Sequence, residues 1–138
     1  MGKYIKIFTL FLTGALIYVL IELAWRGHSH WTMFLIGGMM FVLIGSINEY
    51  IPWEMPLWLQ GIIGSGIVTI TELLSGYIIN IKLGWHVWDY SNMPLNLAGQ
   101  ICLPFSLLWI LMSIVAIGVD DWLRYWLFGE ERPHYKLI

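Results

Sequence analysis

The chain has 138 residues, of which 59% are hydrophobic and 12% charged, and its mean hydropathy is +0.73. This composition is too apolar for a soluble domain of such length, so we expect an integral membrane protein in contact with the lipid bilayer. The net charge of -2 argues against a nucleic-acid partner, and the single cysteine excludes an intrachain disulfide and a cysteine-based metal cluster.

Four apolar segments are long enough to cross a bilayer as helices, which takes about 20 residues each. They cover residues 5–25, 32–51, 57–81 and 96–119. Backbone groups in lipid must be satisfied within their own segment, and these runs lack the alternation of barrel strands, so helices are favoured. The sequence predicts a single all-α membrane domain over 1–138, with four transmembrane helices in an antiparallel bundle. Residues 120–128 mix charges with aromatic rings, which predicts a short interfacial C-terminal helix.

The first apolar run has no small-residue cleavage pattern after it, so we expect a retained helix and not a signal peptide. Lys and Arg residues are more numerous at the two ends of the chain and in the second loop than in the first and third loops. The first group is Lys3, Lys6, Arg124, Arg132 and Lys136, and the second is Arg26 and Lys82. We therefore predict a multi-pass protein of the cytoplasmic membrane with both termini cytoplasmic and the first and third loops outside.

Glu72 is the most unusual residue of the apolar segments. It shares a stripe at helical spacing with Ser65, Thr69, Gly76 and Asn80 on an otherwise aliphatic helix. A charge at the bilayer centre costs about 2.5–3.5 kcal/mol on insertion scales, so such residues usually face a bundle interior or a wet cavity. Close helix packing would explain the small residues but does not require a carboxylate. We therefore predict that Glu72 accepts a proton or a cation.

Further polar residues are expected near Glu72, at the outer edge of the membrane. Glu22 and Arg26 are spaced as an i,i+4 ion pair, although interfacial snorkelling would also explain Glu22. Asn96 and Gln100 stand one turn apart at the start of the predicted fourth span, where their amides can face Glu72 and Asn80.

The third loop has two readings. Asp89 can belong to the same binding pocket, or it can cap a local turn together with Ser91 and Asn92. His28, His30 and His86 with Asp89 or Glu22 would make a zinc site, but their spacing is weak support. We predict no metal site, and the sequence does not identify a cofactor.

One stretch of the chain carries a family resemblance. Its residues are Glu72, then Trp88-Asp89-Tyr90-Ser91, and then Pro94, Asn96, Gly99, Gln100, Ile101, Cys102, Ser106 and Trp109. This stretch resembles the bacterial putative ABC-transporter type IV family, and the first span, with Gly14 and Glu22, is similar to the opening helix of that family. The resemblance implies a small multi-helix protein of the cytoplasmic membrane, usually labelled a permease.

Three functions fit these observations. The first is a small transport component with an outward-facing polar pocket made by Glu72, Asn80, Asp89, Asn96 and Gln100, with Glu22 and Arg26 at its edge. Four helices enclose little space, so this function predicts a homo-oligomer or a partner membrane subunit.

The second function is a membrane-embedded enzyme acting on a lipid or lipid-linked substrate, with Glu72 or Asp89 as general base and His86 as proton shuttle. The third is a non-catalytic accessory subunit of a membrane complex, in which Trp88 and Tyr90 contact a partner.

Overall fold

The computed structural model describes residues 2–51 and 54–135, so Lys136, counted above among the cationic residues, lies outside it. Within these ranges the regular structure is helical except for one short hairpin, in agreement with the predicted all-α class. In chain order the elements are α1 (Lys3–Arg26), α2 (Trp31–Gly45), α3 (Ile47–Tyr50), α4 (Leu57–Gly76), the π-helix η1 (Tyr77–Lys82), β1 (Asn96–Leu97), β2 (Ile101–Cys102) and α5 (Leu103–Phe128).

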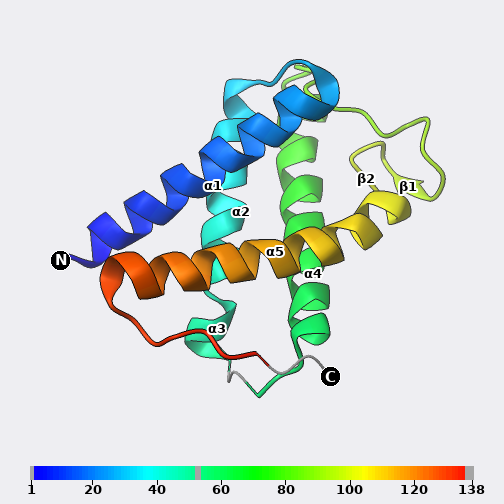
Figure 1. Cartoon of the computed structure of the whole chain (residues 1–138). Helices are drawn as coiled ribbons and strands as arrows, with labels where there is room; N and C mark the ends of the chain where they lie inside the picture. The colour runs from blue at the N-terminus through cyan, green and yellow to red at the C-terminus, as the bar shows by residue number, and fades with distance from the viewer. Residues whose placement is uncertain (1, 52–53, 136–138) are drawn as a thin grey trace.

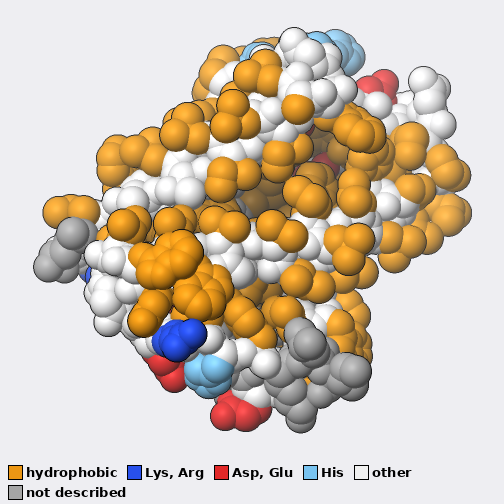
Figure 2. Space-filling model, viewed as in Figure 1, with side chains coloured by type: hydrophobic (Ala, Val, Ile, Leu, Met, Phe, Trp, Pro, Cys, Tyr) orange, Lys and Arg blue, Asp and Glu red, His pale blue; other side chains and the backbone are white. Residues whose placement is uncertain are grey.

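Among the residues that the structure describes, three helical segments are long and apolar enough to cross a membrane: α1, the continuous helix formed by α4 and η1, and α5. Figure 2 shows apolar side chains covering most of the visible face of α1 and α5, while charged side chains gather at the rim. An apolar surface of this extent on a folded chain is expected where it contacts lipid. The structure therefore agrees with a membrane protein.

The second predicted span is shorter than expected. Helix α2 has 15 residues, which gives a length of about 22 Å at 1.5 Å per residue. It ends because Ser46, with ψ -7°, departs from helical geometry and its hydroxyl donates to the carbonyl of Val42 at 2.7 Å. The remaining residues to Tyr50 form the separate helix α3. The predicted range 32–51 is thus two helices.

The helices form two crossed layers and not four side-by-side rods. Figure 1 shows α1 and α5 in one layer, crossing over α2 and α4 in the other. Helix α1 packs mainly on α2, and α5 packs mainly on α4. The core lies where the layers meet and is made of Met33, Ile36, Met40, Ile44, Val68 and Ile117. Because α1 and α5 diverge along their length, a space remains between them.

Glycines permit the closest helix contacts. A Cβ on Gly14 would collide with Phe41, and a Cβ on Gly64 would lie 2.5 Å from the Cβ of Ser113. These contacts join α1 to α2 and α4 to α5. Small residues at helix crossings let the backbones approach, which is the usual packing mode in membranes.

The predicted fourth span, 96–119, starts too early. Residues 96–97 and 101–102 pair as an antiparallel hairpin, and α5 begins only at Leu103. Ala98 and Gly99 between the strands have φ of 55° and 71°, which is left-handed backbone that no α-helix can include. Pro104 then lies in the first turn of α5, where its missing N–H loses no hydrogen bond. Pro104 starts this helix and does not kink it.

The prediction of a separate interfacial helix over 120–128 is also wrong, because α5 runs without a break to Phe128. The charges that suggested it have partners inside the bundle. Asp120 is fully buried, and its Oδ2 accepts a hydrogen bond from Nε of Arg124 at 2.8 Å. Nη1 of Arg124 also lies 3.4 Å from Oε1 of Glu49. The hydroxyl of Tyr135, from the C-terminal tail, donates to Asp121 at 2.9 Å. Paired charges do not force the helix to turn toward the surface.

Candidate functional site

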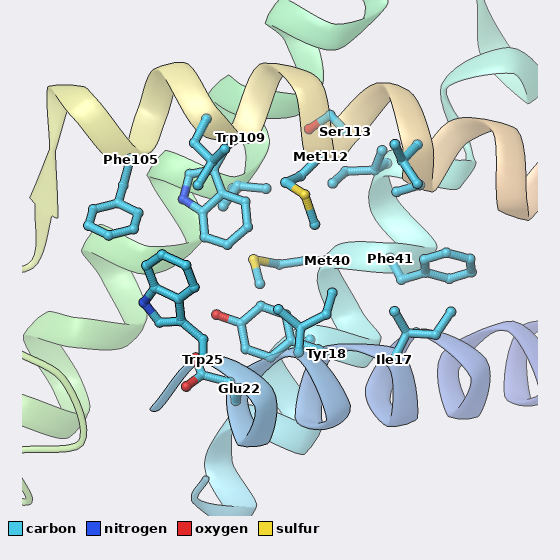
Figure 3. A pocket seen from close by; sticks show the side chains of 18 of the residues that line it. Ile17, Tyr18, Glu22, Trp25, Met40, Phe41, Phe105, Trp109, Met112 and Ser113 are labelled. Carbon is cyan, nitrogen blue, oxygen red and sulfur yellow. The ribbon is translucent and has the colours of Figure 1, made fainter. Parts of the chain in front are cut away.

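A cavity of about 400 Å³ lies between α1 and α5, with α2 behind it. Figure 2 shows the corresponding hollow in the apolar face of the molecule. Its volume lies within the range of small-molecule sites, and its walls are mainly aliphatic and aromatic, as such sites usually are. Figure 3 shows side chains from α1 and from α5 pointing toward one another across it, among them Ile17, Tyr18, Phe105, Trp109 and Met112.

The charged residues of the lining lie at one end. Nε of Arg26 lies 2.8 Å from Oε2 of Glu22, one helical turn earlier in α1. The guanidinium also reaches the carbonyl of Val87 in the third loop at 3.4 Å. Tyr18 stands one turn before Glu22 on the same face, so the three side chains line the cavity together. The expected i,i+4 pair is therefore formed, and it faces the cavity.

Glu72 lies directly behind this end of the cavity. Its side chain is buried, and the hydroxyl of Tyr90 donates to its Oε2 at 3.2 Å. The indole of Trp109 lies near the same carboxylate, but its buried N–H makes no hydrogen bond there. Tyr90 and Trp109 belong to the cavity lining whereas Glu72 does not, so these two rings separate the carboxylate from the cavity. Burial and the neighbouring Glu72 raise the pKa of the Tyr90 phenol, which keeps this hydroxyl a donor.

A buried network holds the third loop in the position that Tyr90 requires. Oδ1 of Asn80 accepts from the amide of Val87 at 2.7 Å, and Nδ2 of Asn80 donates to Oε1 of Gln100 at 2.8 Å. The indole N–H of Trp88 donates to the carbonyl of Gln100 at 3.1 Å. Asn80, Trp88 and Gln100 thus tie the loop to η1 and to the hairpin. They lie outside the cavity lining, so their role is to hold the loop in place.

Asp89 and Asn96 belong to an exposed turn. Oδ1 of Asp89 accepts from the amide of Ser91 at 2.8 Å and from the Ser91 hydroxyl, and these hydrogen bonds lower the pKa of the Asp89 carboxyl. Nδ2 of Asn96 donates to the carbonyl of Met93 at 2.9 Å, and its Oδ1 accepts from the amide of Gly99 at 3.1 Å. This is the capped turn of the second reading. Asn96 and Gln100 are hairpin residues, not neighbours on a helix.

The histidines are placed apart from the cavity. Nδ1 of His30 accepts from the amide of Thr32 at 3.2 Å and caps α2. His28 and His86 are exposed. Across residues 2–51 and 54–135, no three side chains of His, Cys, Asp or Glu gather closely enough to hold a metal ion.

Apart from Tyr90, the sequence analysis did not assign the aromatic residues of the cavity to a site. Tyr18 stacks on Trp109 with ring centroids 6.4 Å apart, and Tyr90 stacks on Phe105 at 5.1 Å. Two signals were available. Tyr18 precedes Glu22 by four residues, and Phe105 precedes Trp109 by four, so each pair lies on one helix face.

Comparison with known proteins agrees with the motif. The sequence profile of one family matches residues 7–128, which is most of the chain. No curated protein and no solved structure matches it. The protein belongs to the family described as putative ABC-transporter type IV.

Proposed function

We propose that the protein is a small permease-like transport component whose cavity between α1 and α5 takes the solute, while Glu72 accepts a proton or a cation. One observation carries this proposal. Tyr90 lines the cavity and also donates its hydroxyl to Glu72. A single side chain therefore contacts both the solute space and the buried acid. The family description, which names a transporter, supports the same conclusion.

The contact suggests how the two events are coupled. A hydrogen bond to an ionised carboxylate is roughly twice as strong as one between neutral groups. Ionised Glu72 holds the Tyr90 hydroxyl away from the cavity, and a proton on Glu72 weakens that hold. The hydroxyl is then free to leave the carboxylate and turn toward the cavity. By linkage, a solute that binds one position of Tyr90 better also shifts the proton equilibrium of Glu72.

The two alternative functions receive less support. An enzyme needs an acid and a base that both reach the substrate. Glu72 lies behind Tyr90 and Trp109, and His86 is exposed outside the cavity lining. A docking surface built on Trp88 would need that side chain accessible, but only 5% of its surface is exposed. The cavity favours transport over both alternatives.

Transport also implies an assembly. The cavity opens between α1 and α5, and one chain does not enclose a path across the membrane. We propose a homo-oligomer or a partner membrane subunit that completes the enclosure. Native mass spectrometry of the purified protein measures the number of copies. A strictly monomeric species with full transport activity would contradict the homo-oligomer.

The test uses proton movement in liposomes that contain a trapped pH-sensitive dye, with valinomycin and potassium to balance charge. The reconstituted parent should dissipate an imposed pH gradient faster than empty liposomes. Glu72→Gln keeps an acceptor for Tyr90 but cannot take a proton, so its rate should fall to that of empty liposomes. Glu54→Gln, at an exposed carboxylate before α4, is the matched control and should behave as the parent. Equal rates for Glu72→Gln and the parent would refute the proposal.

A further inference from the structure

We propose that the cavity takes a hydrophobic organic cation, with its positive centre at the aromatic end beside Glu22 and its apolar part between α1 and α5. This inference rests on the proposed function, because it names the solute class of the same site. The chemistry is an ammonium or phosphonium centre attached to apolar groups. Charge, aromatic rings and the apolar walls each support it.

The first argument is charge. Glu22 and Glu72 bring two carboxylates to this end of the cavity, whereas Arg26 brings one guanidinium. Arg26 is already engaged by Glu22 at 2.8 Å and by the carbonyl of Val87. An ionised Glu72 leaves the region with one excess negative charge. The side chains of Glu22 and Arg26 are only 14% and 26% exposed, so their field on a bound ion is stronger than in solution and favours a cation.

The second argument is the ring of aromatic side chains at the same end. Figure 3 shows Trp25 beside Glu22 on α1 and Phe105 and Trp109 on α5 across the cavity, with the Tyr18 hydroxyl pointing toward Trp25. Faces of aromatic rings attract cations, and several rings around one space are the usual way in which quaternary ammonium groups are recognised. Stacking on Phe105 fixes the plane of Tyr90, and stacking on Tyr18 fixes that of Trp109. These rings are therefore held in place before any solute binds.

The third argument is the rest of the cavity. Beyond Glu22 and Arg26, the lining that the structure describes contains no charged residue. Its walls include Ile17, Met40, Phe41 and Met112, and methionine adapts to apolar groups of different shape. The opening between α1 and α5 faces the apolar side of the molecule, so an apolar solute reaches it from the bilayer (Figure 2).

Two probes of nearly equal size and opposite charge test this inference. Tetraphenylphosphonium is the cation and tetraphenylborate the anion, and binding to nanodiscs is measured by equilibrium dialysis after subtraction of protein-free discs. The parent should bind the cation at least about tenfold more tightly, the ratio that 1.4 kcal/mol provides. Glu22→Gln should weaken cation binding, and Glu54→Gln should not change it. Equal binding of both probes, or a preference for the anion, would overturn the inference.

Arg26→Gln separates this result from loss of folding. It removes the positive charge beside Glu22, so cation binding should become tighter, which a misfolded protein cannot produce. Weaker cation binding in Arg26→Gln, with the parent's helix content by circular dichroism, would also count against the proposal.

The outcomes distinguish this inference from the proposed function. Proton movement that depends on Glu72, without a preference for the cation, refutes only the solute class. Preferential cation binding without that proton movement refutes the transport role and keeps the binding site. Short-chain phosphatidylethanolamine, added as a competitor, identifies the source of the cation. Displacement of tetraphenylphosphonium assigns the site to a lipid ammonium group, and no displacement assigns it to a free cation.

Discussion

The hydroxyl of Tyr90 lies 3.2 Å from the Glu72 carboxylate, and its ring stacks on Phe105 at the edge of the cavity. The neighbouring residues of the Trp-Asp-Tyr-Ser motif make other contacts. Trp88 donates to the backbone of the hairpin, and Asp89 caps the turn through Ser91. The motif thus folds the loop so that the Tyr90 hydroxyl reaches the Glu72 carboxylate.

Tyr90→Phe should make stability less sensitive to alkaline pH. The pKa of tyrosine in an unfolded chain is about 10, whereas burial and Glu72 raise the pKa of Tyr90 in the folded protein. The stabilisation is complete below pH 10 and is lost as the pH rises toward the folded pKa. The transition temperature of the parent in detergent should fall above pH 10, and Tyr90→Phe should fall less. Part of the fall should remain, because burial and Asp121 also raise the pKa of Tyr135.

Tyr77→Phe is the control for this comparison, since Tyr77 is exposed on η1. It should follow the parent at every pH. A Tyr90→Phe curve parallel to that of the parent would show that the phenol is not held by Glu72.

Asn80→Ala should strongly destabilise the fold. It leaves the amide of Val87 and Oε1 of Gln100 buried without a partner, and each such group costs about 1–3 kcal/mol. The free energy of unfolding in mixed detergent micelles should fall by about 2–6 kcal/mol on that basis. Asn92→Ala, in the exposed part of the same loop, should change it by less than about 0.5 kcal/mol. Equal losses in both variants would show that the hydrogen bonds of Asn80 do not hold the loop in place.

The sequence could identify most of these residues but not their division of labour. Glu72 and Asn80 are visible because polar groups are costly inside an apolar helix. Their partners come from a loop whose path depends on left-handed backbone at His86, Leu95 and Ala98. These residue types carry no turn signal, because glycine and asparagine are the usual left-handed residues. From the sequence alone, the residues at the end of the cavity, those that hold the loop in place and those of the exposed turn are therefore all assigned to one pocket.

At the scale of elements, α4 and α5 make a close contact through Gly64. Gly64→Ala should separate them, because its Cβ would lie 2.5 Å from Cβ and 2.6 Å from Oγ of Ser113. Overpacking of this kind costs about 1–3 kcal/mol, which the free energy of unfolding in micelles should register.

Gly66→Ala, two residues further along α4, is the matched control. Its Cβ meets nothing within 4 Å. Alanine is the better helix former by about 0.5–1 kcal/mol in water, so Gly66→Ala should be neutral or slightly stabilising. Equal effects at the two positions would mean that helix propensity and not packing decides.

The helix bounds were predicted well only where lipid determines them. For α1 the predicted range was 5–25 and the observed helix is Lys3–Arg26; for α4 with η1 it was 57–81 and the helix ends at Lys82. Apolar length fixes both. The bounds of α2 and α5 depend on Ser46, the hairpin and the Asp120–Arg124 pair. An average hydropathy over a window does not distinguish these features from ordinary apolar or surface residues.

For the whole molecule, we expect both chain ends on the cytoplasmic side. The test uses Cys102→Ser as background with one new cysteine, either Asn92→Cys in the third loop or Glu131→Cys in the tail, both at exposed positions. A membrane-impermeant maleimide added to intact cells should label position 92 but reach position 131 only after lysis. The reverse pattern would invert the topology and place the Glu22 end of the cavity inside.

The crossed layers give α1 the geometry of a lever. Near its start, Nζ of Lys6 lies 3.2 Å from Oε2 of Glu130 and above the ring of Phe128, so α1 and the end of α5 are joined there (Figure 1). Glu22 and Trp25 lie at the far end of α1. Displacement grows with distance from a pivot, so a small change in the angle between the two helices moves the aromatic end most. A change in this angle would therefore alter the width of the cavity mouth more than the contacts of Lys6 at the joined end.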